Sequence, residues 1–367
     1  MIVDKLDRER TAGTAERNAI HPMKILVTGS SGLIGSQAVE HFDARGHHVH
    51  GVDNNLRRVF FGPEGDTTWN LKRLRDCTKR FEHHDFDIRD QKRVFELFRE
   101  HKFDLIIHCA AQPSHDKACE IPLEDFEINA LATVRLLEAT RKFCAESVFL
   151  HMSTNKVYGD SPNEIPVKEL ETRWEYARQE DWEGVSEECR IDRSLHSLFG
   201  ASKVAADVMA QEYGRYFGMN VGIFRGGCLT GPSHSGAQLH GFLNYLVRVA
   251  VKGETYSVFG YKGKQVRDQI HSFDVIQAIE AFAANPRQGE VYNIGGGRCN
   301  NASILECFEL VREITGKEVR WNYVDRNRKG DHICYISNMG KFKSHYPGWE
   351  LTRTIPDMVR EIASAVD

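Results

Sequence analysis

Short apolar runs alternate with longer amphipathic segments up to about residue 225. The apolar runs predict β-strands at residues 24–28, 48–53, 81–84, 104–109, 147–152 and 221–225. Between them, apolar positions three and four residues apart predict helices that end at about residue 45 or span residues 91–101, 123–144 and 199–217. This alternation predicts an α/β fold, a doubly wound parallel sheet of the Rossmann type with helices on both faces.

A glycine-rich turn separates the first predicted strand from the first helix. Its sequence is Thr28-Gly29-Ser30-Ser31-Gly32-Leu33-Ile34-Gly35. Gly29 permits the tight turn, Gly32 lets the backbone approach a pyrophosphate at the helix N-terminus, and Gly35 lets helix and strand pack closely. We therefore predict that a dinucleotide binds at Gly29, Ser31, Gly32, Leu33, Ile34 and Gly35. A glycine triad alone is also compatible with a simple turn.

The second predicted strand ends in an acidic residue, Asp53, eighteen residues after Gly35. A carboxylate at this place can accept hydrogen bonds from an adenosine ribose, and it repels a 2′-phosphate. The combination predicts NAD as the cofactor in preference to NADP, with Asp53 and the following Asn54 as cofactor-binding residues. The alternative is a turn followed by a solvated aspartate.

The regular alternation of elements ends at residue 225, and this change divides the chain into predicted parts. Residues 1–22 are polar and charged and are interpreted as a flexible extension, and residues 23–225 as the NAD-binding Rossmann domain. Residues 226–367 predict mainly a substrate-binding lobe, from which segments can return to the Rossmann domain. Residues 160–198 form an insertion too long for a plain connection. We interpret it as a lid or a partner surface, with a solvated loop as the alternative.

Composition excludes several classes of function. The 367 residues are 41% hydrophobic, and 48 basic against 52 acidic residues give a net charge of −4. No basic excess is available for nucleic acid or an anionic membrane surface, and no apolar run approaches the roughly 18 residues of a spanning helix. Nine cysteines without a Cys-x-x-Cys pair favour a reduced cytoplasmic location. Histidines gather at residues 47–50 and 83–84, but without the spacing of a structural zinc site, so we predict no metal.

Further motifs follow the later predicted strands in order. They are Asp87-Ile88, Ala110-Ala111-Gln112, Ser153-Thr154-Asn155-Lys156-Val157-Tyr158-Gly159 and Gly200-Ala201-Ser202-Lys203. Together with the glycine turn, this order resembles the extended short-chain dehydrogenase/reductases from residue 24 onward. The resemblance implies NAD contacts at Asp87, Ile88, Ala110, Ala111, Gln112, Asn129, Ser153 and Lys203. It also implies that the Thr154 hydroxyl hydrogen-bonds the reacting oxygen of the substrate.

One position departs from the family pattern, because the tyrosine of the family's Tyr-x-x-x-Lys motif is Phe199 here. In the family, that tyrosine takes the proton from the substrate hydroxyl, and phenylalanine cannot exchange a proton. The catalytic positions implied by the resemblance are therefore Thr154, Phe199 and Lys203, and the general base is unassigned. His115 and His196 are candidate substitutes because imidazole titrates near neutral pH, although each can also be structural.

The resemblance extends to a substrate class. Residues 153–160, 171–174, 224–225, 230–231 and 263–268 look most like those of CDP-paratose 2-epimerases. Sugar-nucleotide 4,6-dehydratases carry an Asp-Glu pair where this chain has Asn155-Lys156, so dehydration is disfavoured. Arg267 and Arg328 resemble diphosphate-binding arginines. Ser114, His115 and Asn155 are the other substrate-binding residues that the resemblance implies.

The main hypothesis is NAD-dependent epimerisation of a nucleoside diphosphate sugar through a transient keto intermediate, at C2 of a CDP-sugar by the nearest resemblance. The helices at 123–144 and 199–217 correspond to those that pair in the two-fold dimers of the family, so a homodimer is expected. Two alternatives stay open. One is a non-catalytic protein that binds NAD or a nucleotide sugar, and the other is an epimerase variant whose base was lost or removed at Phe199.

Overall fold

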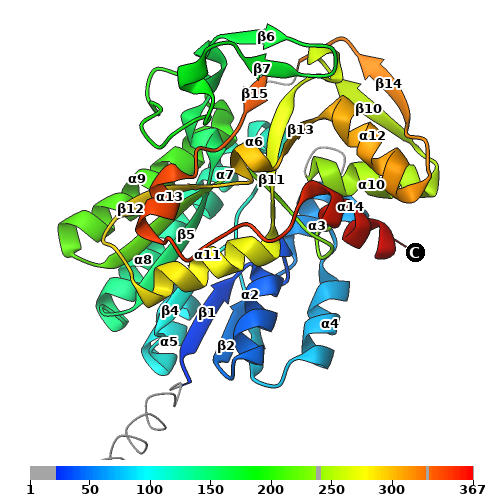
Figure 1. Cartoon of the computed structure of the whole chain (residues 1–367). Helices are drawn as coiled ribbons and strands as arrows, with labels where there is room; N and C mark the ends of the chain where they lie inside the picture. Colours follow the sequence, from blue (N-terminus) through cyan, green and yellow to red (C-terminus); the bar gives the residue numbers. More distant parts are fainter. Residues whose placement is uncertain (1–21, 237–240, 328–329, 367) are drawn as a thin grey trace, which may run out of the picture.

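A sheet of seven parallel strands forms the centre of the protein (Figure 1). The computed structural model describes residues 22–236, 241–327 and 330–366. The strands are β1 (Lys24–Thr28), β2 (His48–Val52), β3 (Phe81–His84), β4 (Leu105–His108), β5 (Val148–Thr154), β8 (Asn220–Gly226) and β12 (Glu290–Ile294). Their order across the sheet is β12-β8-β5-β4-β1-β2-β3. The predicted fold class is confirmed, and the order reverses between β1 and β4, where doubly wound sheets bind dinucleotides.

Helices cover both faces of this sheet (Figure 1). On one face lie α2 (Leu33–Ala44), α11 (Ser272–Ala284) and α13 (Gly340–His345), with α4 (Thr68–Cys77) beside α2. On the other face lie α5 (Gln91–His101), α8 (Ala132–Phe143) and α9 (Ser197–Phe217). Among the described residues, no helix combines the length and the apolar character that crossing a membrane requires.

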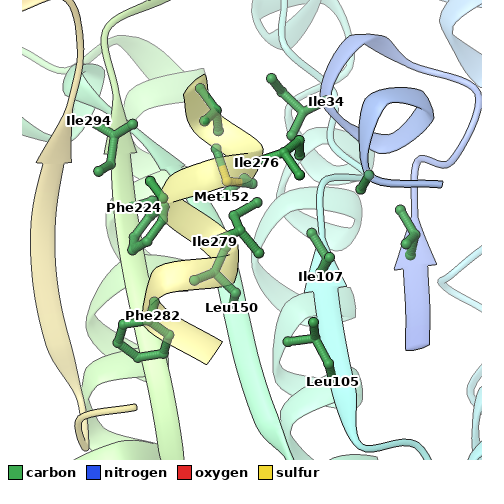
Figure 2. Packing of buried hydrophobic residues seen from close by; sticks show 14 of the residues in the cluster. Ile34, Leu105, Ile107, Leu150, Met152, Phe224, Ile276, Ile279, Phe282 and Ile294 are labelled. Atoms are coloured by element: carbon green, nitrogen blue, oxygen red, sulfur yellow. The ribbon is translucent and has the colours of Figure 1, made fainter. Parts of the chain in front are cut away.

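The first of these faces carries a continuous apolar core. Figure 2 shows Ile276, Ile279 and Phe282 of α11 packed against Leu150 of β5 and Phe224 of β8. All five side chains are fully buried. Because α11 and β12 follow residue 225, the C-terminal part of the chain contributes to the main sheet as well as to the smaller lobe.

Three boundaries differ from the predicted elements, and each difference places a site residue. Strand β5 runs two residues past the predicted end and therefore includes Ser153 and Thr154. Helix α9 begins at Ser197, two residues early. The predicted helix at 123–144 is α7 (Pro122–Phe126), a π-helical turn (Glu127–Leu131) and α8. The wider π turn, a feature often found at functional sites, carries Asn129 towards the loop after β4.

A smaller lobe stands over the carboxyl ends of the strands (Figure 1). It contains β9 (Cys228–Thr230), β10 (Thr255–Phe259), β11 (Val266–His271), β13 (Asn301–Ser303), β14 (Arg320–Val324), β15 (Cys334–Tyr335), α10 (Phe242–Lys252), α12 (Ile304–Thr315) and α14 (Ile355–Ser364). The three helices pack with β10 around their own apolar cluster. Between this lobe and the main sheet, the chain encloses a cavity.

The insertion at 160–198 forms a hairpin of β6 (Val167–Glu169) and β7 (Trp174–Tyr176). It packs on the smaller lobe, since the Trp174 amide donates to the Lys264 carbonyl at 2.8 Å and Arg173 pairs with Glu306 at 3.3 Å. None of its described residues lines the cavity. Across the residues that it describes, the structure therefore shows no lid over the cavity, and a partner surface on the insertion stays a prediction.

Candidate active site

The candidate active site is a cavity of about 480 Å³ at the carboxyl ends of the parallel strands. Residues that directly follow β1, β2, β4, β5 and β8 line it on one side. Residues of the smaller lobe, from α10, β10 and β11, line it on the other. Ligands bind outside the carboxyl ends of open α/β sheets, so the cavity lies where the glycine turn predicts.

The glycine turn leaves no room for side chains at two of its positions. Gly29 has a φ of +68°, and a Cβ there would lie 2.8 Å from the Ala110 nitrogen. A Cβ at Gly35 would lie 2.1 Å from the Gly29 carbonyl oxygen. Helix α2 follows Gly32 and has no side-chain cap among the described residues, so its first amides can receive an anion. Gly29, Gly32, Leu33, Ile34 and Gly35 line the cavity, and this cradle fits the pyrophosphate of NAD.

Asp53 lies beside this turn, where the ribose of a dinucleotide is expected. Its carboxylate accepts hydrogen bonds from the amides of Ser31 at 2.9 Å and Asn55 at 2.8 Å. Ser31 itself is buried outside the cavity lining, so in this structure its amide orients Asp53. Arg57 of the short helix α3 (Leu56–Phe61) also lines the cavity and donates to the Ser235 carbonyl at 2.7 Å.

Asp87 and Asn54 form the next part of the wall. The Asn54 amide donates to Asp87 at 3.2 Å, and the Arg89 guanidinium donates to both Asp87 oxygens, at 3.0 and 2.7 Å. Burial opposes ionisation of Asp87, but the hydrogen bonds from Arg89 outweigh it and lower the pKa of this carboxyl. Asp87 is thus held as an anion, and Ile88 lines the cavity next to it.

The loop after β4 presents Ala110 and Ala111 to the cavity. Behind it, the Gln112 amide donates to Asn129 Oδ1 at 2.9 Å, and Asn129 Nδ2 donates back to the Gln112 carbonyl at 3.0 Å. Asn129 Nδ2 also donates to Ser202 of α9 at 3.1 Å. Gln112 and Asn129 are buried outside the lining. Here they position the loop, and direct contact with NAD stays a prediction for both.

Thr154, Phe199 and Lys203 all line the cavity. The Thr154 hydroxyl accepts from the Lys156 amide at 3.2 Å at the end of β5. Lys203 lies one helical turn after Phe199 and donates to the Met152 carbonyl at 3.0 Å. Burial lowers the pKa of Lys203 to about 8, although Asp207 opposes the shift. A cation therefore stands beside the position where the family has a phenol.

Ser153 lines the cavity too, but its hydroxyl turns inwards. It donates to Asp207 Oδ2 at 2.5 Å. Asp207 is fully buried and pairs with Arg225 through two contacts, of 2.8 and 3.1 Å. This buried ion pair fixes α9 against the ends of β5 and β8. Its contact with Ser153 makes it a support for the site.

The two candidate substitutes for the tyrosine differ in position. His196 Nε2 hydrogen-bonds the Val157 carbonyl at 2.8 Å and does not line the cavity. His115 lines the cavity, and its ring meets the Phe199 ring edge-on, with centroids 4.9 Å apart. Its Nδ1 hydrogen-bonds the Ser197 hydroxyl at 2.8 Å. The structure therefore brings one of the two histidines to the altered position.

Only some of the predicted substrate residues line the cavity. Asn155 and Arg267 line it, whereas Ser114 caps the helix α6 (His115–Glu120) outside the lining by accepting from the Lys117 amide at 3.1 Å. Arg267 is buried and paired with Asp331, so a diphosphate would share its guanidinium with that carboxylate. Arg328 lies outside the described residues.

Sequence reasoning missed several groups in the lining. Lys156 donates to the Gly330 carbonyl at 2.9 Å and lies 3.8 Å from Asp331. Gln265 has a buried Oε1 with no hydrogen-bond partner in the described part of the chain. Each of these three residues, Lys156, Gln265 and Asp331, belongs to a sequence segment from which Asn155, Arg267 or Arg328 was predicted. The whole of each segment, and not one residue of it, could therefore have been assigned to the site. Arg57 had a weaker signal, its place four residues after Asp53.

Comparison with known proteins gives a consistent assignment. A model of the NAD dependent epimerase/dehydratase family matches residues 25–295. A CDP-paratose 2-epimerase of Salmonella typhi is 31% identical over 326 residues, covering 87% of this chain and 92% of that protein. A dTDP-glucose 4,6-dehydratase of Salmonella typhimurium is 27% identical over 357 residues, covering 92% and 91%.

A solved structure agrees. A tyrosine-to-phenylalanine variant of UDP-glucuronic acid 4-epimerase from Bacillus cereus, in complex with UDP-4-deoxy-4-fluoro-glucuronic acid and NAD, has 25% identity and a TM-score of 0.75, and the match covers 94% of this chain and 98% of that one. The relatives are thus epimerases and dehydratases of nucleotide sugars. The fold, the glycine cradle and these matches together show that the chain belongs to the NAD-dependent epimerase/dehydratase family.

Proposed function

We propose that the protein is an NAD-dependent epimerase that inverts C2 of a CDP-sugar through a transient keto intermediate. The observation that carries this proposal is the substrate wall of the cavity, where Asn155 and Lys156 follow Thr154. The acid pair that dehydratases of this fold use to eliminate water is missing at these positions. Asp331 is nearby, but it is paired with Arg267 and lies 3.8 Å from Lys156, and a paired carboxylate is a poor proton donor. The 31% identity to a CDP-paratose 2-epimerase supports the choice of base and carbon.

Each residue then has a role that its position supports. NAD held by the glycine turn would supply a hydride acceptor that is regenerated in each cycle. Lys203 holds the nicotinamide ribose, and Thr154 hydrogen-bonds the reacting oxygen. Arg267 anchors the diphosphate, with Arg328 as its predicted partner. The keto sugar can then rotate about its bonds to the diphosphate while the nucleotide stays bound.

His115 is the group that we propose to carry the proton in place of tyrosine. It contacts Phe199 at the cavity wall, and the Ser197 hydroxyl orients its ring. An imidazole is suited to accept and return a proton near neutral pH. His196 does not share this role because its Nε2 bonds a backbone carbonyl outside the cavity.

The test of the proposed function is conversion of CDP-paratose by the purified protein, followed by NMR of the sugar. We expect the C2 epimer to appear. UDP-glucose and dTDP-glucose serve as comparison substrates. Faster epimerisation of UDP-glucose at C4, or a 4-keto-6-deoxy product from dTDP-glucose, would replace the proposed activity with another of the same family.

A second candidate is a binding protein without turnover, and Phe199 is the observation that favours it. Denaturing the purified protein and assaying the released cofactor, followed by the conversion assay, separates the two functions. Bound NAD together with bound but unconverted CDP-paratose would support the binding protein.

Cofactor choice gives a direct prediction. Asp53 is oriented by two backbone amides at the expected ribose position, and its charge repels a 2′-phosphate. NAD⁺ should therefore bind at least tenfold more tightly than NADP⁺ in a calorimetric titration. Asp53→Asn should reduce this difference in affinity between NAD⁺ and NADP⁺. Equal affinity of the unaltered protein for the two cofactors would contradict the choice of NAD.

A second prediction concerns the diphosphate. Hydrogen bonds to charged groups contribute about 1.5–3 kcal/mol each, and lysine lacks the planar fork of arginine. Arg267→Lys should weaken CDP-paratose binding at least tenfold. Arg298→Lys is the matched control, since Arg298 is also largely buried but pairs with Glu175 outside the cavity. Equal affinity of both variants would show that Arg267 is only structural.

The predicted homodimer has support on the surface of the helices. Helices α7 and α8 pack against α9. Exposed apolar side chains on these helices and on the π turn are Leu123, Phe126, Leu131, Leu198, Val208, Met209, Tyr216 and Phe217. Contiguous exposed apolar surface often marks an interaction site, and we propose that these side chains form the dimer surface. Light scattering at micromolar concentration should give twice the chain mass, and the mass of a single chain would contradict the prediction.

A further inference from the structure

Three histidines meet at the edge of the main sheet, away from the cavity. His50 lies in the middle of β2, His84 ends β3, and His101 ends α5. One ligating nitrogen of each lies within 4.8 Å of the other two. In the parallel register, His50 is paired with Glu82. His84 follows Glu82 by two residues, so the side chains of His50, Glu82 and His84 lie on one face of the sheet.

The distances within this group are those of a ligand set. His50 Nδ1 is 3.1 Å from His84 Nε2. One Glu82 oxygen lies 3.6 Å from His50 Nδ1, and the other lies 3.6 Å from His84 Nε2. Donor atoms bound at about 2.0–2.1 Å to a tetrahedral zinc ion lie about 3.3–3.4 Å apart. The two nitrogens, and each nitrogen with its nearer Glu82 oxygen, thus have nearly the spacing of neighbouring ligands in a coordination tetrahedron. His101 offers a third imidazole, its ring centroid 4.2 Å from that of His50.

The surroundings suit an ion that enters from solvent. The His50 and His84 side chains are only 8% and 17% exposed, whereas Glu82 is 61% exposed. The imidazoles therefore form a preformed inner wall, backed by Phe103 against His50 and His101, and Glu82 can close over the ion from outside. Imidazole with carboxylate ligands suits zinc and related divalent transition metals, while calcium and magnesium prefer oxygen ligands.

We propose that His50, His84, His101 and Glu82 form a binding site for a divalent transition-metal ion, of which zinc is the type. Four protein ligands leave no open position, so the site is structural. The ion would join β2, β3 and α5, and β2 ends one residue before Asp53. This proposal goes against the sequence prediction of no metal, because residues 50, 84 and 101 match no local zinc signature and only the fold brings them together.

The test is zinc binding by untagged protein that has been stripped with a chelator and dialysed. We expect calorimetry to show one zinc ion per chain, and cobalt to give the intense visible absorption of a tetrahedral complex. His84→Gln and His101→Gln should each weaken binding at least tenfold. His83→Gln is the matched control, because His83 lies on the same strand with its side chain on the opposite face.

Circular dichroism of each variant checks that it is folded. His101 is the last residue of α5, so His101→Gln is the variant least expected to disturb the sheet. The proposal is overturned if unaltered protein binds no zinc at micromolar concentration. It is also overturned if His101→Gln binds zinc as tightly as unaltered protein, or if His83→Gln loses binding to the same extent as His84→Gln.

Discussion

His115→Gln is expected to lower kcat by about 10²- to 10⁴-fold, the range that a positioned acid-base group contributes. The physical reason is that glutamine can keep a hydrogen bond to Ser197 but cannot carry a proton. KM for the CDP-sugar should change much less, because Arg267 and not His115 is proposed to anchor the diphosphate. Steady-state kinetics with CDP-paratose measures both constants.

His196→Gln is the matched control, since His196 bonds the Val157 carbonyl outside the cavity. It should retain most of the activity. Phe199→Tyr should leave turnover similar or lower, because an added phenol would compete for the substrate oxygen beside His115. Full activity of His115→Gln, or a rise of about 10² or more in Phe199→Tyr, would show that His115 is not the proton carrier.

Asp207→Leu is expected to cost about 3–5 kcal/mol of unfolding free energy, because it leaves a buried Arg225 without its counter-charge. The pair is almost wholly inaccessible, with exposed fractions of 0% for the Asp207 side chain and 4% for that of Arg225. The change also removes the acceptor of the Ser153 hydroxyl at the cavity wall. Guanidinium unfolding of cofactor-free protein, followed by circular dichroism, measures the effect.

Two further variants test whether the loss of stability comes from the unpaired buried charge. The double variant Asp207→Leu with Arg225→Met should recover much of the loss, since replacing both ions of a buried pair by apolar side chains is often close to neutral. Glu164→Gln, which breaks the exposed pair with Arg190, should change stability little. If Asp207→Leu unfolds at the same denaturant concentration as Glu164→Gln, the buried pair does not support the site.

The fold and the cofactor side of the site could be predicted because their signals are local. Gly29 and Gly35 stand within one turn, which the sequence shows directly, although a side chain at Gly29 would also clash with Ala110 in the loop after β4. Asp53 directly follows a strand, so the end of that strand alone places it at the cavity. Their spacing and their position between predicted elements were sufficient to recognise these residues.

The substrate side depended on contacts between distant segments. His115 and Phe199 lie 84 residues apart in the sequence. The local sequence around His115 and His196 therefore could not show which of the two lies beside Phe199. The pairing of Arg267 with Asp331 and the meeting of His50, His84 and His101 are likewise products of the sheet order. The sequence could suggest each of these residues by itself, but only the folded structure shows which residues they contact.

If the ring carbon is oxidised and reduced again within one site, a deuterium label on that carbon should stay on the sugar. CDP-paratose labelled with deuterium at C2 is incubated with the protein in ordinary water, and the sugar is analysed by NMR and mass spectrometry. We expect the C2 epimer with its deuterium retained, because a hydride does not exchange with solvent during transfer. Loss of the deuterium to water, or unchanged substrate alongside bound NAD, would contradict it.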